Sequence, residues 1–185
     1  MTTAPNTERT DDRLIVELKK IHEQNDRGSL ALLRGWWSPA TKHRAWPVFG
    51  RLIAYRPEQH APGYYLADEM TAALFAVHCR RELLHLPGVS LGRCCLQLAG
   101  GSQKAAGFEA FERHFMRLLA SDSLEDLGDQ LHGIIKRAER ESTPLDYNRL
   151  LWDLRTWNKN SDEIKNRWAI DFWQAPAELQ PSTDS

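Results

Sequence analysis

The residues of this sequence best suited to chemistry are its cations. Seventeen arginines outnumber seven lysines, and the planar guanidinium group can hold a phosphate through two parallel hydrogen bonds. The formal net charge is only -1, but residues 27–117 carry 12 basic and 6 acidic side chains, whereas residues 118–185 carry 8 and 13. This distribution indicates a phosphate-binding surface supplied mainly by the middle of the chain.

Some of these cations recur at helical spacing. Arg113 and Arg117 are four residues apart, and His132, Lys136 and Arg140 repeat the same interval. Residues so spaced share one face of a helix, and both sets fall opposite the apolar residues of their segments. We therefore expect two cationic stripes that together line one surface. Each residue by itself is equally consistent with a solvated face holding local ion pairs.

Further cations join the candidate surface from the N-terminal half and from a glycine-rich segment, AGGSQK at 99–104. That segment lacks the spacing and the preceding strand of a nucleotide-binding loop, so a flexible basic loop against a phosphate backbone is the better interpretation. The candidate nucleic-acid-binding residues are Arg27, Arg34, Arg51, Arg93, Lys104, Arg113, Arg117, Lys136, Arg137 and Arg140.

The sequence gives little support for a metal site or for a catalytic site. Cys79, Cys94 and Cys95 lie near histidines in the sequence, but no two cysteines have the spacing of a zinc site, and adjacent cysteines do not easily face one tetrahedral ion. No nucleophile sits in a motif with a histidine partner. We expect no cofactor, no metal and no enzymatic activity. The scattered histidines and cysteines support only the alternative of a small metal-dependent hydrolase.

Two of the seven tryptophans are candidates for stacking on bases. Trp36 and Trp37 follow Arg34 in a segment predicted to be a loop, where an exposed indole could contact a nucleobase. Trp157 and Trp168 lie on apolar stripes instead, which is typical of core residues.

The elements that must position these residues are predicted to be helices. Leucine occurs 24 times against 4 valines and 7 isoleucines, which favours an all-α fold, a compact helical bundle of about seven to nine helices. Segments 108–119 and 124–135 carry matched apolar stripes, and Ser123 between them is a suitable N-cap. They predict an antiparallel helical hairpin over about 107–141.

Other helices are predicted around 14–21, after an Asp26 cap, over 64–84, from Pro144 after a Thr143 cap, and after a Ser161 cap. The stretches 36–63 and 85–107 are rich in glycine or proline and are expected to be loops, or short helices joined by loops.

These elements make a single domain over residues 11–173, or two helical halves, 11–84 and 107–173, joined by the loop 85–106. Residues 1–10 and 174–185 are polar and predict flexible tails. No apolar run approaches the roughly 20 residues of a membrane span, and the N-terminus lacks the apolar segment of a signal peptide. We expect a cytoplasmic protein with reduced cysteines and no membrane partner.

Several motifs, taken together and in order over residues 11–173, resemble the CasB family. CasB is the small subunit of Cascade, the type I-E CRISPR surveillance complex. The motifs that carry the resemblance are DRGSLALLR at 26–34, SLGR at 90–93, FERHFMRLLASDSLEDLGDQL at 111–131, PLDYNRLLWDLRTW at 144–157 and RWAIDFW at 167–173.

The resemblance implies a non-catalytic, all-helical subunit of an antiviral effector complex that binds nucleic acid without sequence preference. Its partners would be the large subunit, the backbone subunits, a second copy of itself, the guide RNA and the target DNA, whose R-loop and displaced strand it would stabilise. By resemblance, the basic surface includes Arg34, Arg51, Arg93 and Arg113. The acidic C-terminal third favours an alternative, a helical protein–protein adaptor without nucleic-acid contact.

Overall fold

A computed structural model of the chain describes residues 11–53 and 64–174, and the fold is stated for these residues. They form eight α-helices and two short 3-10 helices, and within these ranges there is no β-strand, which confirms the all-α prediction. The elements in chain order are α1 (Arg13–Glu23), α2 (Arg27–Arg34), η1 (Gly35–Trp37), η2 (Lys42–Ala45), α3 (Trp46–Ile53), α4 (Tyr64–His78), α5 (Leu91–Leu98), α6 (Phe108–Leu119), α7 (Leu124–Arg140) and α8 (Tyr147–Trp173).

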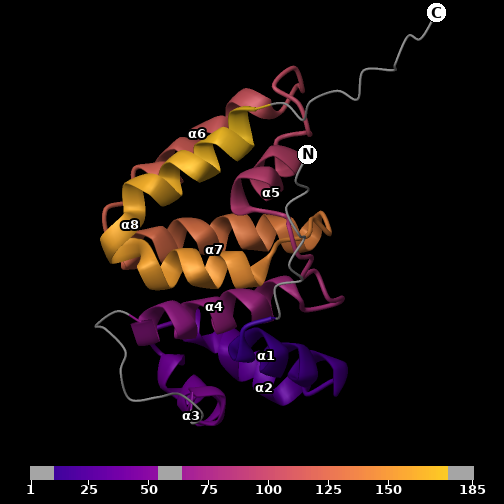
Figure 1. Cartoon of the computed structure of the whole chain (residues 1–185). Helices are drawn as coiled ribbons and strands as arrows, with labels where there is room; N and C mark the ends of the chain where they lie inside the picture. The colour runs from indigo at the N-terminus through magenta and orange to yellow at the C-terminus, as the bar shows by residue number, and fades with distance from the viewer. Residues whose placement is uncertain (1–10, 54–63, 175–185) are drawn as a thin grey trace, which may run out of the picture.

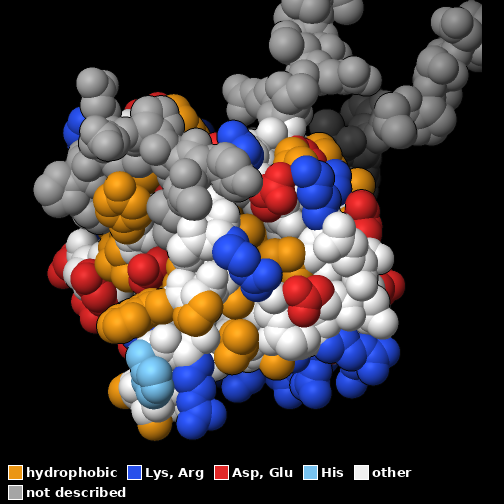
Figure 2. Space-filling view, turned by 90° about the horizontal axis from the view of Figure 1, so that it is seen from below, with side chains coloured by type: hydrophobic (Ala, Val, Ile, Leu, Met, Phe, Trp, Pro, Cys, Tyr) orange, Lys and Arg blue, Asp and Glu red, His pale blue; other side chains and the backbone are white. Residues whose placement is uncertain are grey.

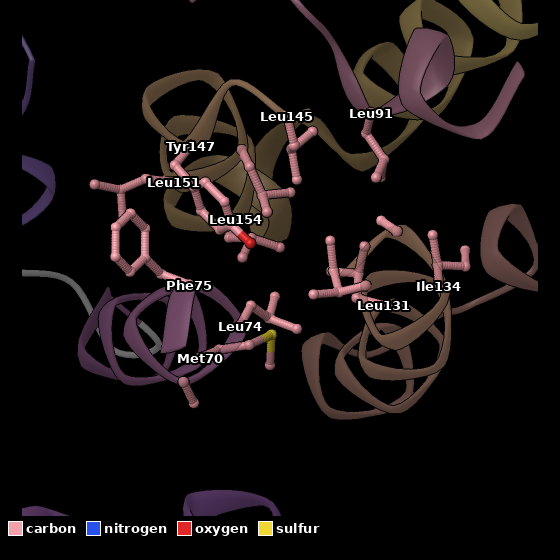
Figure 3. Close-up of a cluster of buried hydrophobic side chains, with 14 of the residues drawn as sticks. Met70, Leu74, Phe75, Leu91, Leu131, Ile134, Leu145, Tyr147, Leu151 and Leu154 are labelled. Carbon is pink, nitrogen blue, oxygen red and sulfur yellow. The ribbon is translucent and has the colours of Figure 1, made fainter. Parts of the chain in front are cut away.

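The helices are arranged around α4 (Figure 1). Helices α1 and α2 cover one side of α4, with α3 packed against α1 and α2, while α7 and the first half of α8 lie on the other side of α4. Side chains of α4, α7 and α8 point toward one another in a shared core that includes Leu74, Leu131 and Leu151 (Figure 3). Helices α5, α6 and the second half of α8 form the opposite end of the molecule.

Helix α8 is two helices joined at a sharp bend. Asn160 has non-helical backbone angles, φ -132° and ψ 24°, and the Trp157 and Trp168 rings on either side of the bend stack with centroids 5.6 Å apart. The break directly precedes Ser161, where the sequence predicts a new helix. Both tryptophans are buried, as their apolar stripes predicted.

The first half of α8 begins later than predicted. Its N-cap is Asp146, whose side chain accepts a hydrogen bond from the Arg149 amide at 3.1 Å, so the prediction of a Thr143 cap is wrong. Residues 143–146 are held by another segment instead: the Leu145 amide donates to the Leu84 carbonyl at 3.0 Å, and the Leu86 amide donates to the Leu145 carbonyl at 3.1 Å. This pairing satisfies backbone groups that a longer helix would have used.

Helices α6 and α7 follow each other through the short reversal at 120–123, as predicted. Ser123 caps α7, with its hydroxyl oxygen 3.0 Å from the Asp126 amide. The two matched stripes nevertheless bury against different partners. Phe115 of α6 stacks on Phe172 of α8 with centroids 4.2 Å apart, whereas α7 packs on α4. The arms of the hairpin therefore open away from the turn (Figure 1).

The two glycine- and proline-rich stretches contain short helices. The stretch 85–107 includes α5, which Ser90 caps, and the stretch 36–63 includes η2, α3 and the last two residues of η1. In α5, a Cβ on Gly92 would overlap the Trp168 carbonyl oxygen and lie 2.7 Å from the Asp171 Cβ, so glycine permits the close contact with α8.

Parts of three predicted segments lie outside the described residues: the whole tail 1–10, the tail 174–185 apart from Gln174, and residues 54–63 of the stretch 36–63. Among the helices that are described, none has the length and apolar character needed to cross a membrane.

Candidate nucleic-acid interface

Two adjoining depressions form a strongly cationic concave surface. Their volumes are about 460 and 690 Å³, and they share Arg34, Arg80 and Arg81. We call them together the basic groove, and its six cations are Arg27, Arg34, Arg80, Arg81, Lys136 and Arg140.

Three segments that pack together bring these cations to one surface. Asp26 caps α2 by accepting a hydrogen bond from the Ser29 amide at 2.9 Å, which sets the position of Arg27 at the first residue of that helix. Arg34 lies two turns further along α2. Arg80 and Arg81 directly follow the end of α4, and α7 contributes Lys136 and Arg140. Since α2 and α7 both pack against α4, the groove follows from the core of the fold.

The charges in the groove are poorly balanced. Glu139 is the one carboxylate among the described residues that line either depression. Its Oε1 lies 3.4 Å from the Arg81 Nε. No ion pair between described residues involves Arg80, Lys136 or Arg140. An anionic ligand would therefore meet cations that are already exposed and mostly uncompensated.

Arg34 lies at the junction of the two depressions. It is half-buried, and its Nη1 donates to the Ala76 carbonyl at 3.3 Å, which fixes the side chain against α4. Burial, and next the neighbouring Arg80 cation, hold the pKa of Arg34 below its usual value. Arg34 keeps its positive charge, because a guanidinium group is not deprotonated in proteins.

An aromatic pair underlies part of the groove wall. The His132 ring stacks on Trp37 with centroids 4.3 Å apart and planes 6° from parallel. Burial, and then the Lys136 cation, lower the pKa of His132. Trp36 is only 7% exposed and its indole nitrogen donates to Glu69 at 3.1 Å, so it is a core residue and the prediction of an exposed stacking residue is wrong there.

The groove accounts for four of the ten predicted binding residues: Arg27, Arg34, Lys136 and Arg140. Arg51 lies beside α2, where it donates to the Ser29 hydroxyl at 2.9 Å, but it does not line the groove. The remaining five, Arg93, Lys104, Arg113, Arg117 and Arg137, belong to α5, α6, α7 and the loop at 99–107, and none of them lines it.

Arg137 differs from its neighbours on α7 because it contacts the protein itself. Its Nε donates to Glu141 at 2.7 Å and its Nη2 donates to the Leu98 carbonyl at 2.8 Å. Its guanidinium also lies 4.9 Å from the centroid of the Phe111 ring. These contacts join α7 to α5 and α6, which is a packing role.

Figure 2 shows the end of the molecule formed by α1, α2 and α3. Lys and Arg side chains gather in a row along the lower edge of this view, whereas acidic side chains are scattered over the rest of the face. Other Lys and Arg side chains lie singly elsewhere on this face, so the row marks where cations are most closely spaced.

The family of the chain follows from its sequence. The family model for CRISPR-associated protein Cse2 matches residues 29–173, most of the chain. The chain belongs to the CRISPR-associated Cse2 family. This confirms the resemblance to CasB. A search of curated protein sequences gives no match.

Solved structures of Cse2-family proteins have the same fold. CasB from Thermobifida fusca superposes with a TM-score of 0.69 at 17% identity, covering 89% of this chain and all of its own. A Cse2-family CRISPR-associated protein from Thermus thermophilus has a TM-score of 0.69 at 24% identity, covering 86% and 95%. CasB from M. ruber has a TM-score of 0.65 at 20% identity, covering 88% and 93%.

Two groove residues of this Cse2-family chain, Arg80 and Arg81, are missing from the sequence prediction. The predicted helix 64–84 placed them inside a helix, whereas α4 ends at His78 and both arginines follow it. The available signal was the Arg-Arg pair itself within the basic middle segment. Their position beside α2 and α7 depends on tertiary packing.

The cysteines and the nearby histidines of this Cse2-family chain lie in the core or close to it. Cys79, Cys94 and Cys95 are fully buried, and burial raises the pKa of Cys79 and of Cys94 to about 12. His78 is buried too, with its ring nitrogens 3.0 Å from the Tyr147 hydroxyl and 2.8 Å from the Thr143 carbonyl. Within 11–53 and 64–174, no three His, Cys, Asp or Glu side chains are grouped so that they could hold a metal ion.

Proposed function

We propose that this Cse2-family chain is the non-catalytic small subunit of a type I-E CRISPR Cascade complex, and that its basic groove binds the nucleic-acid backbone. The observation that carries the proposal is the groove itself: six cations face one concave surface where Glu139 is the single carboxylate among the described lining residues. Family membership supports the role in Cascade.

The groove suits phosphates better than bases. Arginine and lysine contacts to phosphate release condensed counterions and carry no sequence information. The indole of Trp36 is buried and Trp37 is covered by His132, so the aromatic residues nearest the groove already have partners. The binding we propose is therefore independent of sequence.

Modest contacts of this kind are sufficient to stabilise an R-loop. Exchanging a DNA duplex for an RNA–DNA duplex is nearly balanced in free energy, so protein contacts to a strand can tip it. In the complex we propose, the groove faces the guide RNA, the target strand or the displaced strand, and the neighbours are the large subunit, the backbone subunits and a second copy of the chain.

The test is a pair of matched charge reversals. Lys136→Glu/Arg140→Glu changes two exposed groove cations, and Arg44→Glu/Lys159→Glu makes the same charge change at exposed positions outside the groove. We expect the groove variant to bind a DNA oligonucleotide about tenfold more weakly or worse at low salt, because two phosphate contacts become repulsions. Fluorescence anisotropy measures both affinities, and equal losses in the two variants would contradict the proposal.

A protein–protein adaptor without nucleic-acid contact is the second candidate function. Two exposed tryptophans favour it, since Trp46 is 62% exposed and Trp152 is 60% exposed, and large aromatic residues are enriched at interfaces. This function predicts that the chain joins a Cascade assembly while the wild type shows no salt-dependent DNA binding. Co-purification and anisotropy on the same sample separate the two.

A further inference from the structure

The two depressions of the basic groove differ in composition. The smaller one, of about 460 Å³, is lined by His22, Asn25, Arg27, Leu30, Arg34, Arg80 and Arg81, and no carboxylate is among these residues. The larger one contains Glu139, which neutralises part of the charge of Arg81. The lining side chains of each depression carry four net positive charges, so the charge is more densely packed in the smaller one, which we call the arginine pocket.

Two cations of the arginine pocket lie close enough to repel each other. Arg34 and Arg80 line both depressions together, and the Arg80 charge, after burial, lowers the pKa of Arg34. A guanidinium group has five N–H donors, and the one hydrogen bond that Arg34 makes to described residues joins its Nη1 to the Ala76 carbonyl. Like charges held together in this way cost stability until an anion binds between them.

A third arginine that lines the pocket, Arg27, is restrained by a hydrogen bond. Asn25 has a positive φ of 54°, in the left-handed region that asparagine tolerates better than most residues. Its side-chain oxygen accepts a hydrogen bond from the Arg27 Nε at 3.2 Å. This bond restrains Arg27 by its Nε and leaves the two Nη groups to form a fork toward an anion.

We propose that the arginine pocket is a distinct subsite for a phosphate group carrying two or more charges. A phosphodiester inside a strand has a single charge, which one bidentate guanidinium satisfies. Four guanidinium groups, of which only Arg81 is paired with a carboxylate, match a terminal phosphate or a polyphosphate better. The ligand is either the phosphorylated end of a strand or a free polyphosphate; only the strand-end assignment rests on the proposed function.

The first experiment uses pyrophosphate and isothermal titration calorimetry. Arg27→Gln/Arg80→Gln alters the arginine pocket, and Lys136→Gln/Arg140→Gln is the matched control in the larger depression. We expect the pocket variant to lose about tenfold or more in pyrophosphate affinity and the control to stay within about twofold, because charge-assisted hydrogen bonds to phosphate are lost only in the first. All four positions are exposed, and circular dichroism checks that both variants fold.

Absence of pyrophosphate binding by the wild type, or equal weakening in both variants, would overturn the inference. This outcome is distinct from failure of the proposed function, which is judged by salt-dependent DNA binding. If the wild type binds pyrophosphate but no DNA, the result supports the phosphate site in the arginine pocket and contradicts the proposed function. If the wild type binds DNA but no pyrophosphate, the result supports the proposed function and contradicts the phosphate site in the arginine pocket.

The second experiment identifies the source of the phosphate. The probes are oligonucleotides of one sequence with a 5′-phosphate, a 3′-phosphate or two hydroxyl ends. If strand ends are the ligand, the wild type binds one phosphorylated form more tightly than the hydroxyl form, and Arg27→Gln/Arg80→Gln abolishes that preference. Equal binding of all three forms, together with pyrophosphate binding, overturns the strand-end assignment and assigns the pocket to free polyphosphate.

Discussion

His78 is a buried imidazole whose two ring nitrogens both have partners. A backbone carbonyl can only accept, so Nε2 donates to the Thr143 carbonyl, and Nδ1 accepts from the Tyr147 hydroxyl. The side chain is 0% exposed, and burial lowers its pKa to about 4, although the Thr143 hydrogen bond opposes this shift. The neutral ring is thus part of the core between α4 and α8.

This environment predicts a loss of stability in mild acid. An imidazole in the unfolded chain titrates near 6.5, so between that pH and about 4 the unfolded state takes up a proton that folded His78 does not. The stabilisation is complete above about pH 6.5, and the free energy of unfolding falls by about 3 kcal/mol as the pH drops through this window to about 4. Urea denaturation at stepped pH measures the fall.

The control for this prediction is an exposed histidine. His78→Gln should flatten the pH dependence of the free energy of unfolding, whereas His43→Gln should leave it as in the wild type, because His43 is exposed. An unchanged slope in His78→Gln would show that another group produces the acid sensitivity.

At the residue scale, helical spacing predicted some of the cations that line the groove, but it did not decide which cations line it. Lys136 and Arg140 were predicted from their interval of four, and both line the groove. Arg137 was grouped with them, but its donors are directed to Glu141 and Leu98. Periodicity predicts which residues share a face of a helix. Whether a cation there contacts other protein groups depends on the neighbouring helices, which the spacing does not predict.

Asp153 holds the bend of α8 together. It is 2% exposed, and it accepts hydrogen bonds from the Arg167 guanidinium and, at 2.8 Å, from the Trp168 indole. On an unbroken helix, residues so far apart in sequence would be separated by about 21 Å. They meet because the helix folds back at Asn160, so the carboxylate joins the two halves.

Replacing this carboxylate should therefore lower the free energy of unfolding. Asp153→Ala leaves the Trp168 N–H and the Arg167 guanidinium without their acceptor, and we expect a loss of about 2–4 kcal/mol in the free energy of unfolding. Asp162→Ala, at an exposed position just past the bend, should change it by no more than about 0.5 kcal/mol. Urea denaturation compares the two, and near-UV circular dichroism follows the Trp157–Trp168 pair. Equal effects would mean that Asp153 does not secure the bend.

At the element scale, local signals predicted the fold well and long-range pairing produced the error. The Asp26 and Ser123 caps were identified from the sequence, and both side chains accept the expected amide hydrogen bonds. The Thr143 cap was wrong because residues near 145 pair with residues near 85. A cap is encoded within four residues, whereas that pairing joins segments about 60 residues apart in the chain.

At the scale of the whole molecule, most of the candidate nucleic-acid-binding cations gather in two separate places. The basic groove lies where α2, α4 and α7 meet, while Arg113 and Arg117 form an exposed pair on α6 at the other end. We propose the α6 pair, with Arg93 and Lys104, as a second and independent contact to nucleic acid.

The salt dependence of DNA binding tests this division. If all six groove cations contact phosphates, log K should fall with log salt at a slope of about -5 on duplex and about -4 on a single strand. Lys136→Gln/Arg140→Gln should reduce the duplex slope by about 2, and Arg113→Gln/Arg117→Gln should reduce it by a similar amount only if α6 also contacts the strand. Slopes unchanged in the groove variant would contradict the groove as the binding surface.

Chemical labelling of the three buried cysteines can measure how readily the fold opens. Cys79, Cys94 and Cys95 are inaccessible to solvent, and burial holds their pKa values far above neutral, so almost no reactive thiolate is present. A thiol reagent can modify them only when the surrounding helices separate. Cys79 follows α4, and Cys94 and Cys95 belong to α5, so labelling compared by peptide mass distinguishes local separation of α5 from global unfolding without a probe being added to the chain.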